Sequence, residues 1–205
     1  MGWGPNARRG TGRRLSSGYR NNTALLRWLL CTPLALAGSP ALAGGALPAG
    51  GQYTAGQGTI TGSANALTIN QSSSHGIINW QGFSIGAGNR VQFNNGAGAT
   101  LNRVTGKTLS RIDGSLSATG SVCLINPQGV VVGPGGKVVT NGSFVASTRD
   151  VSDSAFMSGG ALSASGTSNG DVVNAGTITS ANGDAILVGR WVKNTGSISG
   201  PGGTV

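Results

Sequence analysis

The sequence holds few side chains of the kinds that carry out acid–base or nucleophilic chemistry. Its one histidine, His75, stands in the polar run Ser72–Gly76, and all five acidic residues are aspartates. A Ser-His-Asp hydrolase would need this imidazole to pair with an aspartate and to activate a serine held on a strand-to-helix turn. Neither partner is recognisable beside His75. We therefore interpret it as a surface or turn residue and predict no catalytic residues.

The aspartates and the one glycine-rich lysine stretch do not form a known type of site either. Glycoside hydrolysis and Ca²⁺-assisted lyase chemistry need acidic residues on neighbouring strands, and Asp171 and Asp184 do not provide such a pair. The stretch Gly133–Lys137 is similar to a phosphate loop, but Val131 and Val138 stand where that loop needs Gly and Ser or Thr. We read it as a glycine corner, and we expect no cofactor and no metal site.

The most ordered part of the chain is Ser121–Gly133, where two aliphatic runs flank Asn126-Pro127-Gln128-Gly129. Aliphatic and β-branched residues favour strands, Pro127 fixes φ and Gly129 permits a positive φ, so the four residues predict a tight turn. Both runs are nearly continuous rather than alternating, which favours strands buried on both faces or packed in a stack. One strand therefore passes directly to the next.

A short sequence motif, a phrase of four residues in the order glycine, polar, aliphatic, polar, recurs along the chain. A second apolar run follows several copies, and we group Ala66–Ile69, Val122–Ile125 and Ala185–Val188 as equivalent. The last two copies are in register at a spacing of 20 residues, with Asn174 matching Asn194. These two asparagines either form a side-chain ladder or are independent turn residues. The copies of the phrase are Gly58–Thr61, Gly114–Ser117, Gly176–Thr179 and Gly196–Ser199.

This period predicts the fold class. With 38 glycines and 9% charged residues, composition alone would favour a disordered chain. Disorder would not keep an aliphatic residue in phase over four copies, whereas a period near 20 without a helical pattern is typical of a β-solenoid. Parallel pairing between coils then stacks the aliphatic side chains in interior columns.

Two segments depart from the coil pattern. We expect 44–57 to begin irregularly and then to cover the open end of the solenoid, because stacked repeats need a cap. Residues 149–169 follow no register and predict a loop or small hairpin that leaves the stack. At the other end, Pro201–Val205 overlays Ala181–Ala185, so we expect the chain to be the front part of a longer exoprotein.

Residues 1–43 are typical of an export signal. Six arginines precede an apolar stretch, 28–36, and the small-x-small sequence Ala41–Ala43 follows, so we place cleavage after Ala43. Without this leader the net charge falls from +9 to about +3 and the remaining basic residues are scattered, which argues against a nucleic-acid partner. Only Cys123 would remain, inside an apolar run, so we predict a buried thiol and no intrachain disulfide.

Several blocks in 44–205 resemble the secretion domain of filamentous-haemagglutinin-type exoproteins, the two-partner secretion domain, and the high-molecular-weight adhesin subgroup in particular. Gln128 and Cys123 depart from the pattern, where the family usually has asparagine and commonly an aromatic residue. The resemblance implies a right-handed parallel β-helix, which makes the predicted fold an all-β single-stranded solenoid. The blocks are Ile78–Gly86, Val91–Phe93, Leu101–Gly106, Ile112–Gly114 and Val122–Val130.

The resemblance also implies a function. Such a domain crosses the inner membrane by a cleaved signal, is recognised unfolded in the periplasm by a partner outer-membrane β-barrel transporter with periplasmic recognition domains, and folds at the cell surface. It is secreted or displayed there, as part of an adhesin with a host-cell or bacterial surface ligand. The alternatives are a β-helix enzyme acting on polysaccharide and the export module of a contact-dependent toxin. The residues expected to serve recognition or secretion are Asn79, Trp80, Phe83, Asn126, Pro127, Gln128 and Gly129.

Overall fold

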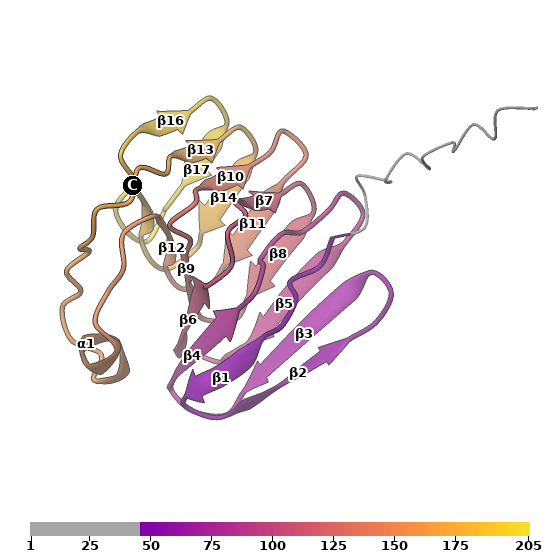
Figure 1. Ribbon diagram of the computed structural model, residues 1–205, viewed down its shortest axis with the longest axis vertical. Coiled ribbons are helices and arrows are strands. Elements are labelled where there is room, and N and C mark those ends of the chain that lie inside the picture. Colours follow the sequence, from indigo (N-terminus) through magenta and orange to yellow (C-terminus); the bar gives the residue numbers. More distant parts are fainter. Residues whose placement is uncertain (1–45) are drawn as a thin grey trace, which may run out of the picture. The chain divides into compact units, whose positions relative to one another are not determined.

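The computed structural model describes residues 46–205, which form a stack of parallel coils (Figure 1). The predicted leader, with its cleavage position, lies outside the described residues. The first of three sheets runs the length of the stack and places its strands in the order β17-β14-β11-β8-β5-β3-β2. The strands of this seven-stranded sheet are β2 (Gly58–Gly62), β3 (Ala66–Gln71), β5 (Arg90–Asn94), β8 (Ser115–Ala118), β11 (Lys137–Thr140), β14 (Thr177–Ser180) and β17 (Ser197–Ser199).

Two further sheets close the coils. The six-stranded sheet has the order β1-β4-β6-β9-β12-β15, and the four-stranded sheet has the order β16-β13-β10-β7. The six strands are β1 (Gln52–Ala55), β4 (His75–Trp80), β6 (Ala99–Val104), β9 (Ser121–Ile125), β12 (Phe144–Ser147) and β15 (Ala185–Val188). The four strands are β7 (Ser110–Ile112), β10 (Val130–Val132), β13 (Val172–Asn174) and β16 (Val192–Asn194).

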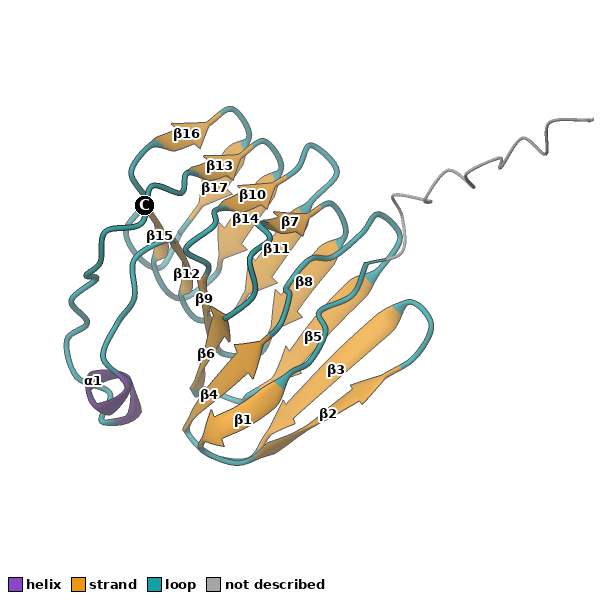
Figure 2. Ribbon diagram, in the orientation of Figure 1, coloured by secondary structure: helices purple, strands orange, loops and turns teal. Residues whose placement is uncertain are grey.

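The chain visits the three sheets in turn, so each coil stacks on the one before it and the strands pair in parallel (Figure 2). The arrangement is a right-handed parallel β-helix of about six turns, as predicted. Residues 20 positions apart pair at the C-terminal end, where Val172 faces Val192 and Ile178 faces Ile198. Asn174 Nδ2 donates to Asn194 Oδ1 at 2.9 Å, so these two side chains form the ladder rather than two independent turns.

The interior columns supply most of the core. Leu116, Val138 and Ile178 are wholly buried on successive strands of the seven-stranded sheet. Burying one aliphatic side chain contributes roughly 1.5–3 kcal/mol, and repetition over the coils adds such side chains to a core that has few aromatic residues.

The N-terminal cap is present but larger than predicted. Strand β1 pairs antiparallel with β4, and β2 pairs antiparallel with β3, so both cover the first coil. Gly58–Thr61 is therefore part of the cap, and its inclusion among the coil repeats was wrong. The local glycine-polar-aliphatic-polar pattern specifies a strand with one inward face but not the direction in which it pairs.

The grouping of second apolar runs also needs a correction. Val122–Ile125 and Ala185–Val188 both lie in the six-stranded sheet, whereas Ala66–Ile69 pairs with β5 in the seven-stranded sheet. Because the hairpin of β2 and β3 takes the place of a regular coil, β3 occupies the position that Ser115–Ala118 takes two coils later.

The predicted excursion leaves the stack between β12 and β13. Val122 and Phe144, which pair in neighbouring coils, are 22 positions apart in the chain. Phe144 and its partner in the next coil, Ala185, are 41 positions apart. The extra residues contain a short helix, α1 (Asp153–Met157), whose N-cap Ser152 accepts a hydrogen bond from the Ala155 N–H. The excursion is not a regular hairpin, since its two arms meet only at the single antiparallel bridge Asp150–Ser165.

Candidate functional site: two motif corners and a polar pocket

The turn after β9 is built as the sequence predicts, and Asn126 is its central residue. The Gly129 N–H donates to the Asn126 carbonyl at 3.0 Å, and Gly129 adopts a φ of 122°. The Asn126 side chain accepts the Gln128 N–H and donates to Thr108 O and Ser110 Oγ at 3.0 and 2.9 Å. Asn126 therefore closes its own turn and attaches it to the preceding coil.

The members of this turn differ in exposure. Asn126 is wholly buried and Gly129 is buried, whereas Pro127 and Gln128 face solvent. The proline carbonyl accepts a hydrogen bond from Ser168 Oγ at 2.6 Å, so the end of the excursion lies against the turn. In the folded domain a partner can contact Pro127 and Gln128 but not the asparagine amide.

The second predicted block, at the end of β4, anchors the first coils. The Trp80 and Phe83 rings are buried and meet edge-to-face, with centroids 5.4 Å apart. The Trp80 indole N–H donates to Asn102 Oδ1 at 2.9 Å, inside the core. Such an aromatic pair contributes about 0.5–1.5 kcal/mol beyond its burial.

Sequence reasoning did not find the role of Asn102. This side chain is wholly buried in β6, one coil beyond Trp80, and it holds the indole that the adjacent coil supplies. The available signal was an asparagine within a run with strand character, because strands are depleted in this residue.

Asn79 lies on the outward side of β4, in register with Arg103 of β6. Its Oδ1 atom is buried, yet among the described residues it has no hydrogen-bond partner. A buried carbonyl oxygen without a partner costs about 1–3 kcal/mol. The folded domain therefore does not account for an asparagine at this position.

The structure does not bring the two predicted blocks into one site. Both follow the ends of strands in the six-stranded sheet and so occupy the same corner of the β-helix, but β6 separates β4 from β9. They form two motif corners of one solenoid rather than a single pocket.

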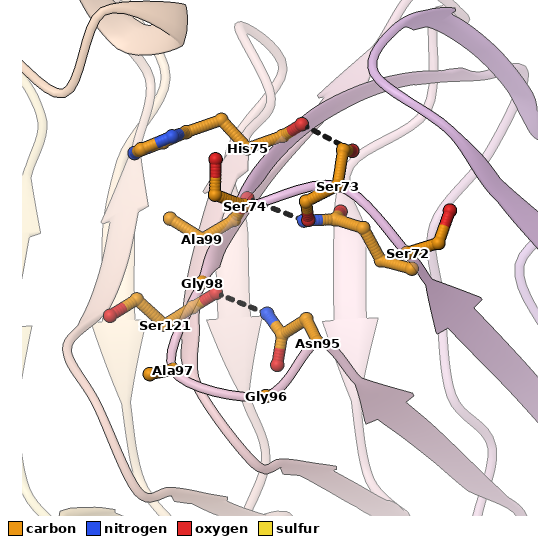
Figure 3. Close-up of a pocket in the computed structure, with 11 residues that line it drawn as sticks. Ser72, Ser73, Ser74, His75, Asn95, Gly96, Ala97, Gly98, Ala99 and Ser121 are labelled. Atoms are coloured by element: carbon orange, nitrogen blue, oxygen red, sulfur yellow. Dashed lines mark hydrogen bonds between the residues drawn. The ribbon is translucent and has the colours of Figure 1, made fainter.

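His75 borders an open pocket of about 570 Å³ between the two larger sheets (Figure 3). Its ring meets Phe156 edge-on at 5.6 Å, and no Asp, Lys or Arg side chain lines the pocket. Buried amides build the wall: Asn95 Nδ2 donates to Thr100 Oγ1 and to Ser121 O, and Thr100 donates to Gln71 Oε1. These bonds join three successive coils.

The described residues offer little else for catalysis. Within 46–205, no three His, Cys or Asp side chains gather in a way that could hold a metal ion. The letters Gly-x-Ser-x-Gly occur at 166–170, but Ser168 donates to Pro127 O and the segment leads into a strand, not into a helix. In the same part of the chain, no helix is long and apolar enough to cross a membrane.

Comparison with known proteins places the chain in a class, the secretion modules of exported β-helix proteins. The model of the TPS secretion domain matches residues 44–205, so the chain belongs to the family of two-partner secretion domains. It serves as the secretion-targeting domain of a two-partner exoprotein, and neither alternative function is favoured.

The crystal structure of the HMW1 secretion domain from Haemophilus influenzae superposes with a TM-score of 0.68 at 34% identity. The match covers 75% of this chain and 42% of that one. Two heme/hemopexin-binding proteins of Haemophilus influenzae are 36% and 37% identical over 98 and 99 residues, or 47% and 46% of this chain. The matched segment spans 11% of the length of each of these relatives.

Proposed function

We propose that a partner outer-membrane β-barrel transporter recognises this domain while it is unfolded, through the two motif corners around Asn79 and Asn126. The observation that carries the proposal is burial. Asn126, Trp80 and Phe83 are at most 1% exposed in the folded domain. A partner can therefore bind these side chains only before the coils close, which corresponds to passage through the periplasm and folding at the cell surface.

Asn79 can distinguish a role in recognition from a role in folding. Asn126 makes three side-chain hydrogen bonds, so its loss would weaken the fold as well as any recognition. The Asn79 Oδ1 atom contributes no hydrogen bond to the described fold. A requirement for Asn79 in secretion would therefore reflect the unfolded chain.

We expect Asn79→Ala to leave the domain at least as stable as the wild type, because it removes a buried carbonyl oxygen that has no partner, and to weaken binding of the urea-unfolded chain to the transporter's periplasmic domains. Binding is measured after dilution from urea on immobilised periplasmic domains, and stability by urea titration with circular dichroism. Folded wild-type protein is the matched control and should not bind. Equal binding of folded and unfolded protein would contradict recognition before folding.

We further propose that the domain itself is not an enzyme and that any surface ligand is bound by the wider exoprotein. The absence of acidic pairs in the sequence supports the first part. The two relatives named heme/hemopexin-binding proteins support the second part. The segment matched in each of them is 11% of its length, so most of each relative lies outside the matched segment. Secretion to the medium or to the cell surface follows from the same proposal.

Purified protein should therefore show no hydrolase or lyase turnover on common polysaccharides, with or without added Ca²⁺. Reducing-end and unsaturated-product assays measure this directly. Reproducible turnover that disappears in Asp171→Asn or Asp184→Asn would contradict the proposal and would favour the polysaccharide-enzyme alternative.

A further inference from the structure

The outward side of the six-stranded sheet carries an apolar column. Ile77 pairs with Leu101, Leu101 with Cys123, Cys123 with Val145 and Val145 with Ile186, so one aliphatic or thiol side chain per strand faces outward over five strands. Within the first three strands Ile77, Leu101 and Cys123 are nonetheless buried, together with Ile125.

The excursion covers these first strands. Phe156 of α1 is 5% exposed and packs in the same cluster as Ile77, Leu101, Cys123 and Ile125, with Val151 and Met157 against it. Figure 2 shows α1 and its two connecting loops outside the coils, beside the six-stranded sheet. We call residues 150–165 the strap.

An ionic clamp holds the base of the strap. Arg103, on the outward side of β6, donates to Asp150 Oδ1 through Nε and Nη2 at 3.0 and 2.9 Å and to Asp153 Oδ1 at 2.7 Å. It also donates to the Val151 carbonyl. Burial alone would lower the pKa of Arg103, but the hydrogen bonds and charges of the two aspartates outweigh it and raise the pKa.

We propose that the strap is a lid, held by the Arg103–Asp150–Asp153 clamp and by Phe156, that opens and closes over the apolar column while the coils stay stacked. In the closed state it hides Cys123. In the open state it presents an apolar strip on the outer face of β4, β6 and β9.

The hydrogen-bond pattern supports opening without loss of the coils. Among residues 46–205, no hydrogen bond between backbone groups joins 151–164 to a coil, and the bonds of the Asp150–Ser165 bridge lie within the strap itself. Strand β12 pairs with β9 and β15, and β13 pairs with β10 and β16, so both ends of the strap stay attached to the stack. Opening therefore breaks only side-chain contacts, which places the strap among the low-stability parts of a fold.

The chain order gives opening a place in folding. The apolar column of β4, β6 and β9 lies between 77 and 125, whereas the strap that covers it begins at 150. An N-terminal-first folding order exposes this strip until the strap docks, so strap closure is the step that buries it.

Cys123 reports on the lid. Burial, reinforced by the negative charge of Asp150, raises the pKa of its thiol to about 12, so in the closed state it is protonated and inaccessible. Opening returns the thiol to water, where its pKa is about 8.5 and alkylation proceeds. The test uses the full chain with Cys31→Ser, which leaves Cys123 as the one thiol.

The experiment follows iodoacetamide labelling of this protein at pH 8 over low urea concentrations, with the global unfolding rate and stability measured in parallel. We expect Arg103→Gln to accelerate labelling about fivefold and to leave the stability of the coils nearly unchanged. The expected acceleration is modest because the two carboxylates of the clamp are half exposed, and water weakens their interaction with Arg103. Asp150→Asn combined with Asp153→Asn should do the same. The three substitutions together should accelerate labelling no further, because they remove one clamp.

The control is Arg111→Gln, which removes the Arg111–Asp113 ion pair outside the strap and should leave the labelling rate unchanged. Labelling of the wild type should also depend weakly on urea, because opening exposes little surface compared with unfolding. The lid proposal would be wrong if labelling followed global unfolding in its rate and urea dependence, or if Arg103→Gln left the labelling rate unchanged.

Discussion

Replacement of Asn126 by alanine should lower the amount of protein that reaches the medium by about tenfold or more when a cognate transporter is present. The wholly buried side chain satisfies the Gln128 N–H, the Thr108 carbonyl and the hydroxyl of Ser110, which is wholly buried too. A buried group that loses its partner costs about 1–3 kcal/mol. The folded turn is therefore weakened by roughly 3 kcal/mol, and a proposed recognition residue is lost as well.

Quantitative immunoblotting of medium and periplasm measures the secreted fraction, and urea titration of the purified variant measures stability. Asn94→Ala is the matched control, since Asn94 is an exposed asparagine that bonds to Asn70 across the coils. It should change both quantities little. Secretion of Asn126→Ala at the wild-type level would leave Asn126 as a purely structural turn residue.

Gly106→Ala should destabilise the domain by about 3 kcal/mol or more, because the corner after β6 has no room for a side chain. A Cβ built on Gly106 would overlap the carbonyl oxygen of Gln81 in the coil below. Backbone cannot move aside as a flexible side chain can, so the two coils would have to separate. Overpacking in a close-packed interior costs typically 1–3 kcal/mol, and more where the backbone must shift.

The free energy of unfolding by urea, followed by circular dichroism, measures the effect. Gly82→Ala is the matched control because its added Cβ would meet no atom within 4 Å and its φ is not positive. It should change stability by less than about 1 kcal/mol. Similar losses in both variants would show that glycine content rather than coil spacing sets the requirement.

Much of the architecture follows from local pattern. The 20-residue period predicts the parallel pairing of Val172 with Val192 and of Ile178 with Ile198, because each coil must return the chain above its start. The Asn126–Gly129 turn follows from residue types, since Pro127 and Gly129 restrict the backbone locally. Cys123 is buried as its apolar run predicts, but it faces outward, and the strap is what covers it.

The direction of pairing at the N-terminus did not follow from the sequence. Gly58–Thr61 has the same letters as a coil strand, yet it runs antiparallel to β3 as part of the cap. A strand's polar–apolar alternation specifies only which side chains face inward. Which strand it pairs with, and in which direction, depends on the empty edge that the first coil leaves.

Contacts between residues distant in sequence were decided by the tertiary structure alone. A stack of short strands, a tight corner at Asn126 and few catalytic groups could all be predicted beforehand, because they depend on residue type and spacing. Stacking then placed Asn102 against the Trp80 indole, Ser110 against Asn126 and Arg103 against Asp150 and Asp153. These pairs are 16 to 50 residues apart, and their meeting depends on the length of each coil and on the path of the strap, which no single residue encodes.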